Sequence, residues 1–282
     1  MRSWLRWASD MAEGRITIKS PRQIELMRQA GRLTAEARAF GGSLVQPGIT
    51  TREIDNEIGK FIKSRGGYPS CWHLYGFKGN ACISVNDEII HGVPSSRKLV
   101  EGDIVSIDLC VCVGDYRLDK NGVAIGGYHG DCCGTFACGE ISEEARRLID
   151  QTEHAFWEGF RQAKAGNHVF DISRAVQKDV ESAGYSVIRE YTGHGIGRSV
   201  HEAPEIPNFV PERAVGGNPR LMKNMVICVE PMVNAGSAKI RNRRMPDGWI
   251  VPLTADGKLA AHYENTILIT DGEPEILTRC GD

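Results

Sequence analysis

Apolar residues recur at helical spacing in four segments that form two similar pairs. Ser20 and Pro21 are typical of a helix start, and an apolar stripe follows them, made up of Ile24, Leu26, Met27, Ala30 and Leu33. A second helix is expected over about residues 51–64. In the second pair, Ser142 begins a helix through about residue 163, and another is expected over about residues 170–182. A glycine, Gly48 or Gly166, separates the helices of each pair.

Each helix pair is followed by a matching apolar run. Residues 99–108 and 221–230 both end on an acid nine residues after a leucine, at Asp108 and Glu230. Each half then has a second acid before an apolar stretch, Asp131 or Glu264. We therefore predict an α+β fold with pseudo-twofold halves, about residues 16–140 and 141–282, and a central antiparallel sheet flanked by helices.

The domain organisation follows from the absence of a break between the halves. No Pro- or Ser-rich linker separates them, so residues 16–282 are interpreted as a single catalytic domain. Residues 1–15 are expected to be an N-terminal extension without fixed structure, and they lack the apolar segment of a signal peptide.

Composition narrows the class of protein. With 41% hydrophobic and 25% charged residues and a net charge of −2, the chain does not suggest direct binding to nucleic acid or a membrane. Nine cysteines, an odd number without any CxxC spacing, argue against a disulfide framework and against a zinc ribbon. We therefore expect a cytoplasmic protein in which most cysteines are small core residues.

The acids inside apolar runs carry the candidate chemistry. Burying a carboxylate in apolar surroundings is unfavourable, and several together need a counter-charge. Two divalent cations bound by Asp108, Asp131, Glu230, Glu264 and the imidazole of His194 would supply it. The donor set suits Co²⁺, Mn²⁺, Fe²⁺ or Zn²⁺. The alternative is that each acid lies at a strand end exposed to water.

Two further histidines have settings that suggest a site. His91 ends an apolar segment before Gly92, and His201 precedes Glu202 shortly after the glycine-rich segment around His194. The other histidines have no comparable setting and are interpreted as surface or structural groups or as partners of ligands: His73, His129, His154, His168 and His262.

At these residues the sequence resembles a known family. The segments HGVP at His91, IVSIDLCV with Asp108, HGD with Asp131, GHGIGRSVHEAP, VEPMVNAG and AHYENTILIT resemble, in order, those of type I methionine aminopeptidases. The resemblance covers about residues 16–277. It implies the pita-bread fold, the five residues above as ligands of two metal ions, and removal of the initiator methionine from polypeptides with a small second residue.

The resemblance also implies individual roles. Glu230 would move a proton, His201 would hydrogen-bond the substrate carbonyl, and His91 would contact the scissile amide. The pocket for the methionine side chain would be lined by Cys71, Phe77, Cys82, Val200 and Trp249, which are alternatively ordinary core residues. The implied partners are nascent polypeptide N-termini, with the ribosome as a further candidate, for an enzyme acting as a monomer.

Some positions depart from the family pattern. The span from Asp108 to Asp131 is longer than usual, and Asn121-Gly122 predicts that the extra residues form an extended hairpin. Leu74 and Phe77 replace tyrosines that are common in bacterial relatives, and Val200 replaces a bulkier residue. These changes affect the expected shape of the pocket and leave the expected chemistry intact.

Two other functions compete with this one. Aminopeptidase P and prolidase share the fold and ligands, but usually carry another N-terminal domain and a different glutamate segment from Glu230-Pro231-Met232. A non-catalytic adaptor of the same fold would be expected to lack some ligands, whereas all five are present here.

Overall fold

The four predicted helices are present, and two of them begin at the serines that the sequence indicates. In the computed structural model, which describes residues 14–212 and 217–281, Ser20 caps α2 (Pro21–Ser43) and Thr50 caps α3 (Thr51–Ser64), each through a reciprocal capping box. Ser142 accepts a hydrogen bond from Ala145 N at the start of α4 (Glu143–Gln162). With α5 (Val169–Ser182), these helices confirm both predicted pairs.

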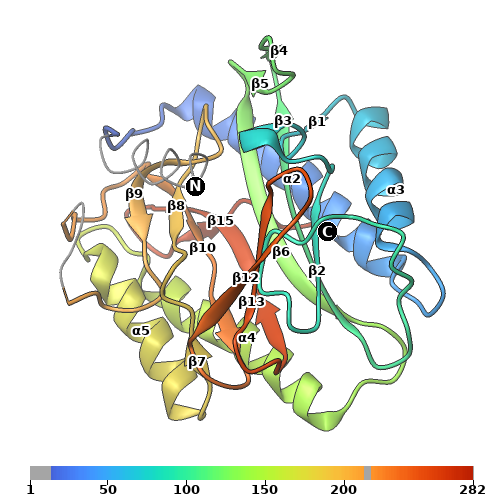
Figure 1. Ribbon diagram of the computed structural model, residues 1–282. Coiled ribbons are helices and arrows are strands. Elements are labelled where there is room, and N and C mark those ends of the chain that lie inside the picture. Colours follow the sequence, from blue (N-terminus) through green and yellow to red (C-terminus); the bar gives the residue numbers. More distant parts are fainter. Residues whose placement is uncertain (1–13, 213–216, 282) are drawn as a thin grey trace.

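The helices flank a central antiparallel sheet (Figure 1). Its strand order is β1-β3-β6-β15-β10-β8-β9, with β2 paired to β3 and β16 to β15. These strands are β1 (Tyr68–Pro69), β2 (Cys82–Val85), β3 (Ile104–Val113), β6 (Tyr128–Ala137), β8 (Gly193–Gly195), β9 (Glu202–Ile206), β10 (Val226–Val229), β15 (Glu264–Leu268) and β16 (Glu275–Ile276). The smaller sheets are formed by β4 (Arg117–Leu118), β5 (Ala124–Ile125), β7 (Ser186–Val187), β11 (Met232–Asn234), β12 (Ile240–Arg244), β13 (Ile250–Thr254) and β14 (Ala260–His262).

The sheet order confirms the duplication predicted from the two halves. β3-β6 from the first half and β10-β15 from the second half are antiparallel pairs, and they meet where β6 pairs with β15. The four acids therefore enter one region from four strands or strand ends that are related by this pseudo-symmetry.

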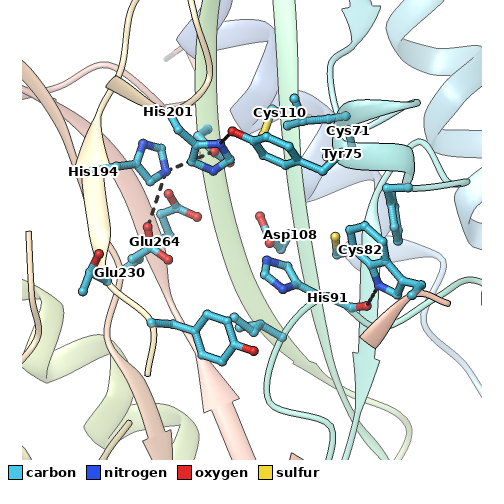
Figure 2. Close-up of a pocket in the computed structure, with 17 residues that line it drawn as sticks. Cys71, Tyr75, Cys82, His91, Asp108, Cys110, His194, His201, Glu230 and Glu264 are labelled. Carbon is cyan, nitrogen blue, oxygen red and sulfur yellow. Dashed lines mark hydrogen bonds and ion pairs between the residues drawn. The ribbon is translucent and has the colours of Figure 1, made fainter. Parts of the chain in front are cut away.

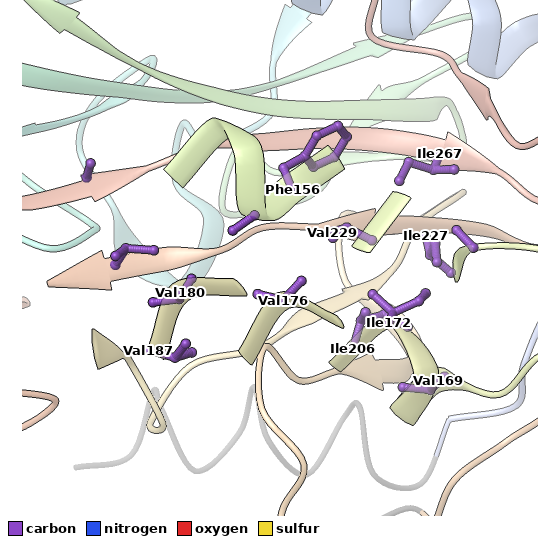
Figure 3. Packing of buried hydrophobic residues seen from close by; sticks show 14 of the residues in the cluster. Phe156, Val169, Ile172, Val176, Val180, Val187, Ile206, Ile227, Val229 and Ile267 are labelled. Atoms are coloured by element: carbon purple, nitrogen blue, oxygen red, sulfur yellow. The ribbon is translucent and has the colours of Figure 1, made fainter. Parts of the chain in front are cut away.

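Each half packs helices against its own strands, and α2 also packs against β10 and β15 of the second half. In the second half, Phe156 of α4 and Ile172 of α5 are fully buried against Ile227 and Val229 of β10 (Figure 3). A separate cluster joins α2 and α3 to the alternate residues of β3, such as Ile107. Because strand residues alternate between the two faces of a sheet, Asp108 is directed away from this apolar cluster.

One predicted strand boundary was wrong. Residues 99–103 precede the strand, and β3 continues five residues beyond Asp108, to Val113, pairing with β6 along its whole length. Asp108 thus lies within a strand rather than at its end. The continuous cross-strand pairing outweighs the interruption that a single acid introduces.

The predicted extended hairpin is present between β3 and β6. Its tip is the pair β4–β5, at the top of the view in Figure 1. Gly122 has a φ of +83°, a conformation that glycine adopts readily, and its N–H donates to Asp119 O (3.0 Å) to close the turn.

Other expectations concern the chain ends and a membrane. None of the helices in the described part of the chain is long and apolar enough to span a membrane. The expected N-terminal extension, residues 1–15, falls mostly outside the described residues, and the assignment of residues 16–282 to one domain stays a prediction.

Candidate metal and peptidase site

The four acids converge because adjacent strands bring them into register. Asp108 on β3 lies opposite Cys133 of β6, and Glu264 at the start of β15 lies opposite the same Cys133 from the other side. Asp131 lies two residues before Cys133, and Glu230 directly follows β10. All four acids and His194 line one pocket (Figure 2).

His194 presents one ring nitrogen to the acids. With its Nδ1–H donating to Gly195 O (2.9 Å), its Nε2 lies 3.5 Å from Glu230 Oε1 and 3.7 Å from Asp131 Oδ2. Burial lowers the pKa of His194 to about 4, so the imidazole is neutral near pH 7. A neutral imidazole whose other nitrogen donates a hydrogen bond is the usual form of a metal-ligating histidine.

The acids are poorly stabilised by the protein itself. Burial, followed by the nearby Asp131 carboxylate, raises the pKa of Asp108, Glu230 and Glu264 well above the usual range. Burial likewise raises the pKa of Asp131 to about 8. Within the described ranges, neither lysine nor arginine forms an ion pair with any of the four acids.

Unsatisfied oxygen atoms show what the pocket lacks. Asp131 Oδ1, Glu230 Oε1 and Glu264 Oε1 are buried without a hydrogen-bond partner. Buried polar atoms are normally hydrogen-bonded or coordinated, so three such carboxylate oxygens facing one pocket fit a site for hard or borderline divalent cations.

Ligand atoms cluster in two overlapping groups among residues 14–212 and 217–281. In each group the ligand atoms lie within 4.8 Å of one another. The first contains Asp131, His194, Cys228 and Glu264, and the second contains Glu230, His262 and Glu264. Glu264 belongs to both groups, as a carboxylate bridging two ions would. Asp108 is in neither group and lines the pocket beside them.

His262 and Cys228 were missed in the sequence. His262, interpreted there as a surface or structural group or a ligand's partner, is 2% exposed, and its Nε2 lies 3.8 Å from Glu230 Oε2. Cys228 lies two residues before Glu230, and its thiol is 3.6 Å from Thr266 Oγ1. For Cys228 the available signal was its spacing of two residues from Glu230, because alternate residues of a strand share a face. His262 ends a separate strand, β14, so this rule does not apply to it.

The predicted pocket wall lies beside these acids. Cys71, Phe77, Cys82 and Val200 pack in one buried cluster with Cys110, and the Trp249 ring lies 5.0 Å from that of Phe77. Val200 packs within this cluster, and the remaining predicted wall residues line the pocket. Sulfur and aromatic groups form an apolar, polarizable surface suited to an unbranched thioether side chain.

His91 and His201 lie on opposite sides of the pocket (Figure 2). His91 has a φ of +59°, and its carbonyl accepts a hydrogen bond from Trp249 Nε1 (3.0 Å). The His201 ring packs edge-on against His194, with centroids 4.4 Å apart. A positive φ is uncommon for residues other than glycine, although histidine adopts it more often than most.

Some lining residues were not identified from the sequence: Tyr75, Ile90, Cys110, Tyr191 and Thr192. Cys110 follows Asp108 by two residues on the same face of β3, and would have been found had the strand been extended. Tyr75 belongs to a short 3₁₀ helix, η1 (Leu74–Gly76), and the others belong to loops, where spacing does not reveal the direction of a side chain.

Comparison with known proteins assigns the family. Residues 25–271 match metallopeptidase family M24. A methionine aminopeptidase from Clostridium perfringens is 47% identical over 93% of this chain and 98% of its own length. The crystal structure of methionine aminopeptidase from Rickettsia prowazekii has a TM-score of 0.85 at 34% identity, covering 94% of this chain and all of that one.

A more distant relative shares the fold. The prolidase from Pyrococcus furiosus has a TM-score of 0.72 at 21% identity, and the match covers 94% of this chain but 66% of the prolidase. The sequence and structural matches agree with the predicted fold. The chain belongs to metallopeptidase family M24, in its methionine aminopeptidase branch.

Proposed function

We propose that this chain removes the N-terminal methionine from nascent polypeptides whose second residue is small, with two divalent metal ions in the acid-lined pocket. The observation that carries the proposal is the convergence of three buried acids, the half-buried Asp108 and the neutral His194 next to a wall of cysteines and aromatic rings. Divalent metal binding follows from membership of the family, whereas the number of ions and their identity as Co²⁺, Mn²⁺, Fe²⁺ or Zn²⁺ are part of the proposal.

The metal ligands would be Asp108, Asp131, His194, Glu230 and Glu264. The three buried carboxylate oxygens without partners support this assignment, and so does the shared position of Glu264 in both donor groups. When bound, the ions would lower the pKa of a water molecule and polarise the scissile carbonyl. Their positive charge would also keep the acids ionised at neutral pH.

The protein's own groups would carry the proton and the substrate. Glu230 would take a proton from the attacking water and deliver it to the leaving amine. Its carboxylate suits this role because it belongs to the donor group with Glu264 and lies 3.5 Å from Nε2 of His194 in the other group. His201 would donate a hydrogen bond from Nε2 to the carbonyl oxygen as negative charge develops. His91, on the other side of the pocket, would contact the nitrogen of the scissile amide.

The pocket wall would select methionine. Cys71, Phe77, Cys82 and Trp249 would contact the thioether side chain, with Val200 supporting them from within the cluster. A cytoplasmic location is part of the proposal. Action as a monomer, with the ribosome as an additional partner, belongs to the proposal as well.

Peptide cleavage tests the proposal against its nearest rival. The metal-loaded enzyme should cleave Met-Ala-Ser, should leave Met-Lys-Ser largely intact, and should not cleave Ala-Pro-Ser. Cleavage restricted to the Xaa-Pro peptide would instead assign the chain to the prolidase group, whose fold it shares.

Glu230→Gln tests for a catalytic rather than an adaptor function. Removing a proton-transfer group should lower kcat by about 100-fold or more, with the circular dichroism spectrum retained. Exposed Glu140→Gln serves as the control and should leave kcat unchanged. An unchanged rate in Glu230→Gln would contradict the proposed role.

A further inference from the structure

The extended hairpin contacts both loops that border the pocket. Its tip, residues 114–127, accepts a hydrogen bond at Gly122 O from the hydroxyl of Tyr68 (2.7 Å), just before the loop that carries the pocket wall. On its other side, Arg198 Nη2 donates to Gly126 O (3.0 Å), three residues before His201. The hairpin therefore connects a loop of the first half with a loop of the second.

The first of these loops has an unfavourable backbone that needs support. His73 and Tyr75 have φ angles of 65° and 52°, in the left-handed region that bulky residues rarely occupy. The His73 ring lies against Gly122, where a Cβ would come within 2.9 Å of His73 Cδ2. Such conformations persist only where neighbouring structure holds them, and here the hairpin supplies that contact.

This backbone directs Tyr75 to His201 across the pocket (Figure 2). The Tyr75 hydroxyl lies 3.3 Å from His201 Nδ1, and the two rings stack with centroids 5.6 Å apart and an angle of 28°. The loop bearing His201 is fixed separately, since Glu202 Oε1 accepts hydrogen bonds from the backbone N–H of Arg198 (2.8 Å) and Ser199 (3.2 Å).

We propose that Tyr75 is a positioning residue that holds His201 in the tautomer with its proton on Nε2, and that the 114–127 hairpin holds Tyr75 in place. A neutral imidazole has a single N–H, and the hydrogen bond made by one nitrogen determines which one carries it. If the Tyr75 O–H donates to Nδ1, the proton of His201 is on Nε2, where it can be donated to the substrate. The proposal rests on the hydrogen-bonding role of His201 in the proposed function.

Tyr75→Phe isolates the hydroxyl because it keeps the stacked ring. In the metal-loaded enzyme kcat should fall by about 10- to 100-fold, the scale seen when the outer hydrogen-bond partner of a functional histidine is lost, with KM for Met-Ala-Ser changed less than threefold. Tyr116→Phe is the matched control. It also removes a tyrosine hydroxyl, but from a residue of the 114–127 hairpin whose ring packs on Tyr68. An unchanged kcat in Tyr75→Phe, or an equal loss in Tyr116→Phe, would overturn the proposal.

The ¹⁵N chemical shifts of His201 report the tautomer without reference to turnover. In the zinc-loaded wild-type enzyme, Nδ1 should show the shift of an unprotonated nitrogen and Nε2 that of a protonated one. Tyr75→Phe should abolish this preference. A wild-type signal from protonated Nδ1, or an identical spectrum in the variant, would contradict the proposal.

Two glycine variants test the hairpin's part. The added Cβ of Gly122→Ala would clash with the His73 ring. Gly114 has a similar positive φ in the same hairpin, but the added Cβ of Gly114→Ala would only contact Leu26 Cδ2, at 3.8 Å. Gly122→Ala should lower kcat at least threefold and weaken the tautomer preference, and Gly114→Ala should do neither. Equal effects of the two variants would contradict the claim that the hairpin holds Tyr75 in place.

His201→Ala separates failure of this inference from failure of the proposed function. If His201→Ala retains the wild-type kcat, the assigned role of His201 is wrong. If His201→Ala is strongly impaired while Tyr75→Phe has a normal kcat and a normal spectrum, the role of His201 stands and only the positioning by Tyr75 is refuted.

Discussion

At the scale of single residues, the feature that decides the chemistry is the removal of neighbouring carboxylates from water. Burial and neighbouring charge raise the pKa of all four acids, and that of Asp131 reaches about 8. A group whose pKa is higher in the folded than in the unfolded protein stabilises the fold at low pH. That stability is lost as pH rises through the folded value.

The metal-free protein should therefore become less stable as pH rises from about 6.5 towards the folded pKa of Asp131, about 8. Below that range the buried histidines, whose pKa values are lowered, act in the opposite direction because they lose a proton on folding. Each pKa unit between the folded and unfolded values of a group corresponds to about 1.4 kcal/mol of unfolding free energy. Thermal unfolding in the presence of a chelator, followed across this range, measures the effect. Asp131→Asn should flatten the dependence, because one of the titrating groups is removed.

Metal binding should reverse this dependence, because the ligands must be deprotonated to bind the ions. The added stability of the metal-loaded protein should increase with pH over the same range. Stability of the metal-free protein that rises with pH above about 6.5, or the same slope in Asp131→Asn, would refute the account of the acid cluster.

At the scale of elements, the extended hairpin shows how a short turn can be secured by one side chain. Asp119 Oδ1 accepts hydrogen bonds from the backbone N–H of Asn121 (2.8 Å) and Val123 (2.9 Å). The hydrogen bond from the Val123 N–H is the main reason why the pKa of Asp119 is below its usual range. Asp119 therefore stabilises the turn at pH values above its unfolded pKa, and this stabilisation is lost as pH falls through its folded pKa.

Acidification below about pH 4, the usual range of an aspartate pKa, should therefore loosen the turn. Amide hydrogen exchange at Asn121 and Val123 should become faster relative to the rest of β3 and β6, and Asp119→Ala should produce the same change at neutral pH. Asp115→Ala, also in the hairpin, is the control. Equal protection of the turn in Asp119→Ala and wild type would show that another contact secures it.

The elements also show what sequence patterns can predict. Helix starts at Ser20 and Ser142 were predicted well, because capping is a local interaction between near neighbours in the chain. The end of β3 was not, because its extension past Asp108 depends on pairing with β6. In the site, the acids stood out as charges within apolar runs, whereas Tyr75 depends on a loop backbone that no spacing rule describes.

At the scale of the whole molecule, duplication explains how a stable fold can contain such an unfavourable site. Helices pack against the strands of their own half in two large apolar clusters, and a third cluster joins α2 to β10 and β15 of the second half. These clusters stabilise the fold around the pocket. The acids lie where β6 and β15 join the halves. The cations that we propose would thus connect the two halves, with Asp108 and Asp131 from one half and His194, Glu230 and Glu264 from the other.

The central claim is that the pocket is a two-metal methionine aminopeptidase site. Its most direct test is to add a divalent metal such as Co²⁺ to chelator-treated protein and to measure both bound metal and cleavage of Met-Ala-Ser. We predict negligible cleavage without metal, activity that rises with added metal, and binding that saturates at two ions per chain. Full cleavage by the metal-free protein, or two bound ions without any cleavage, would contradict the account.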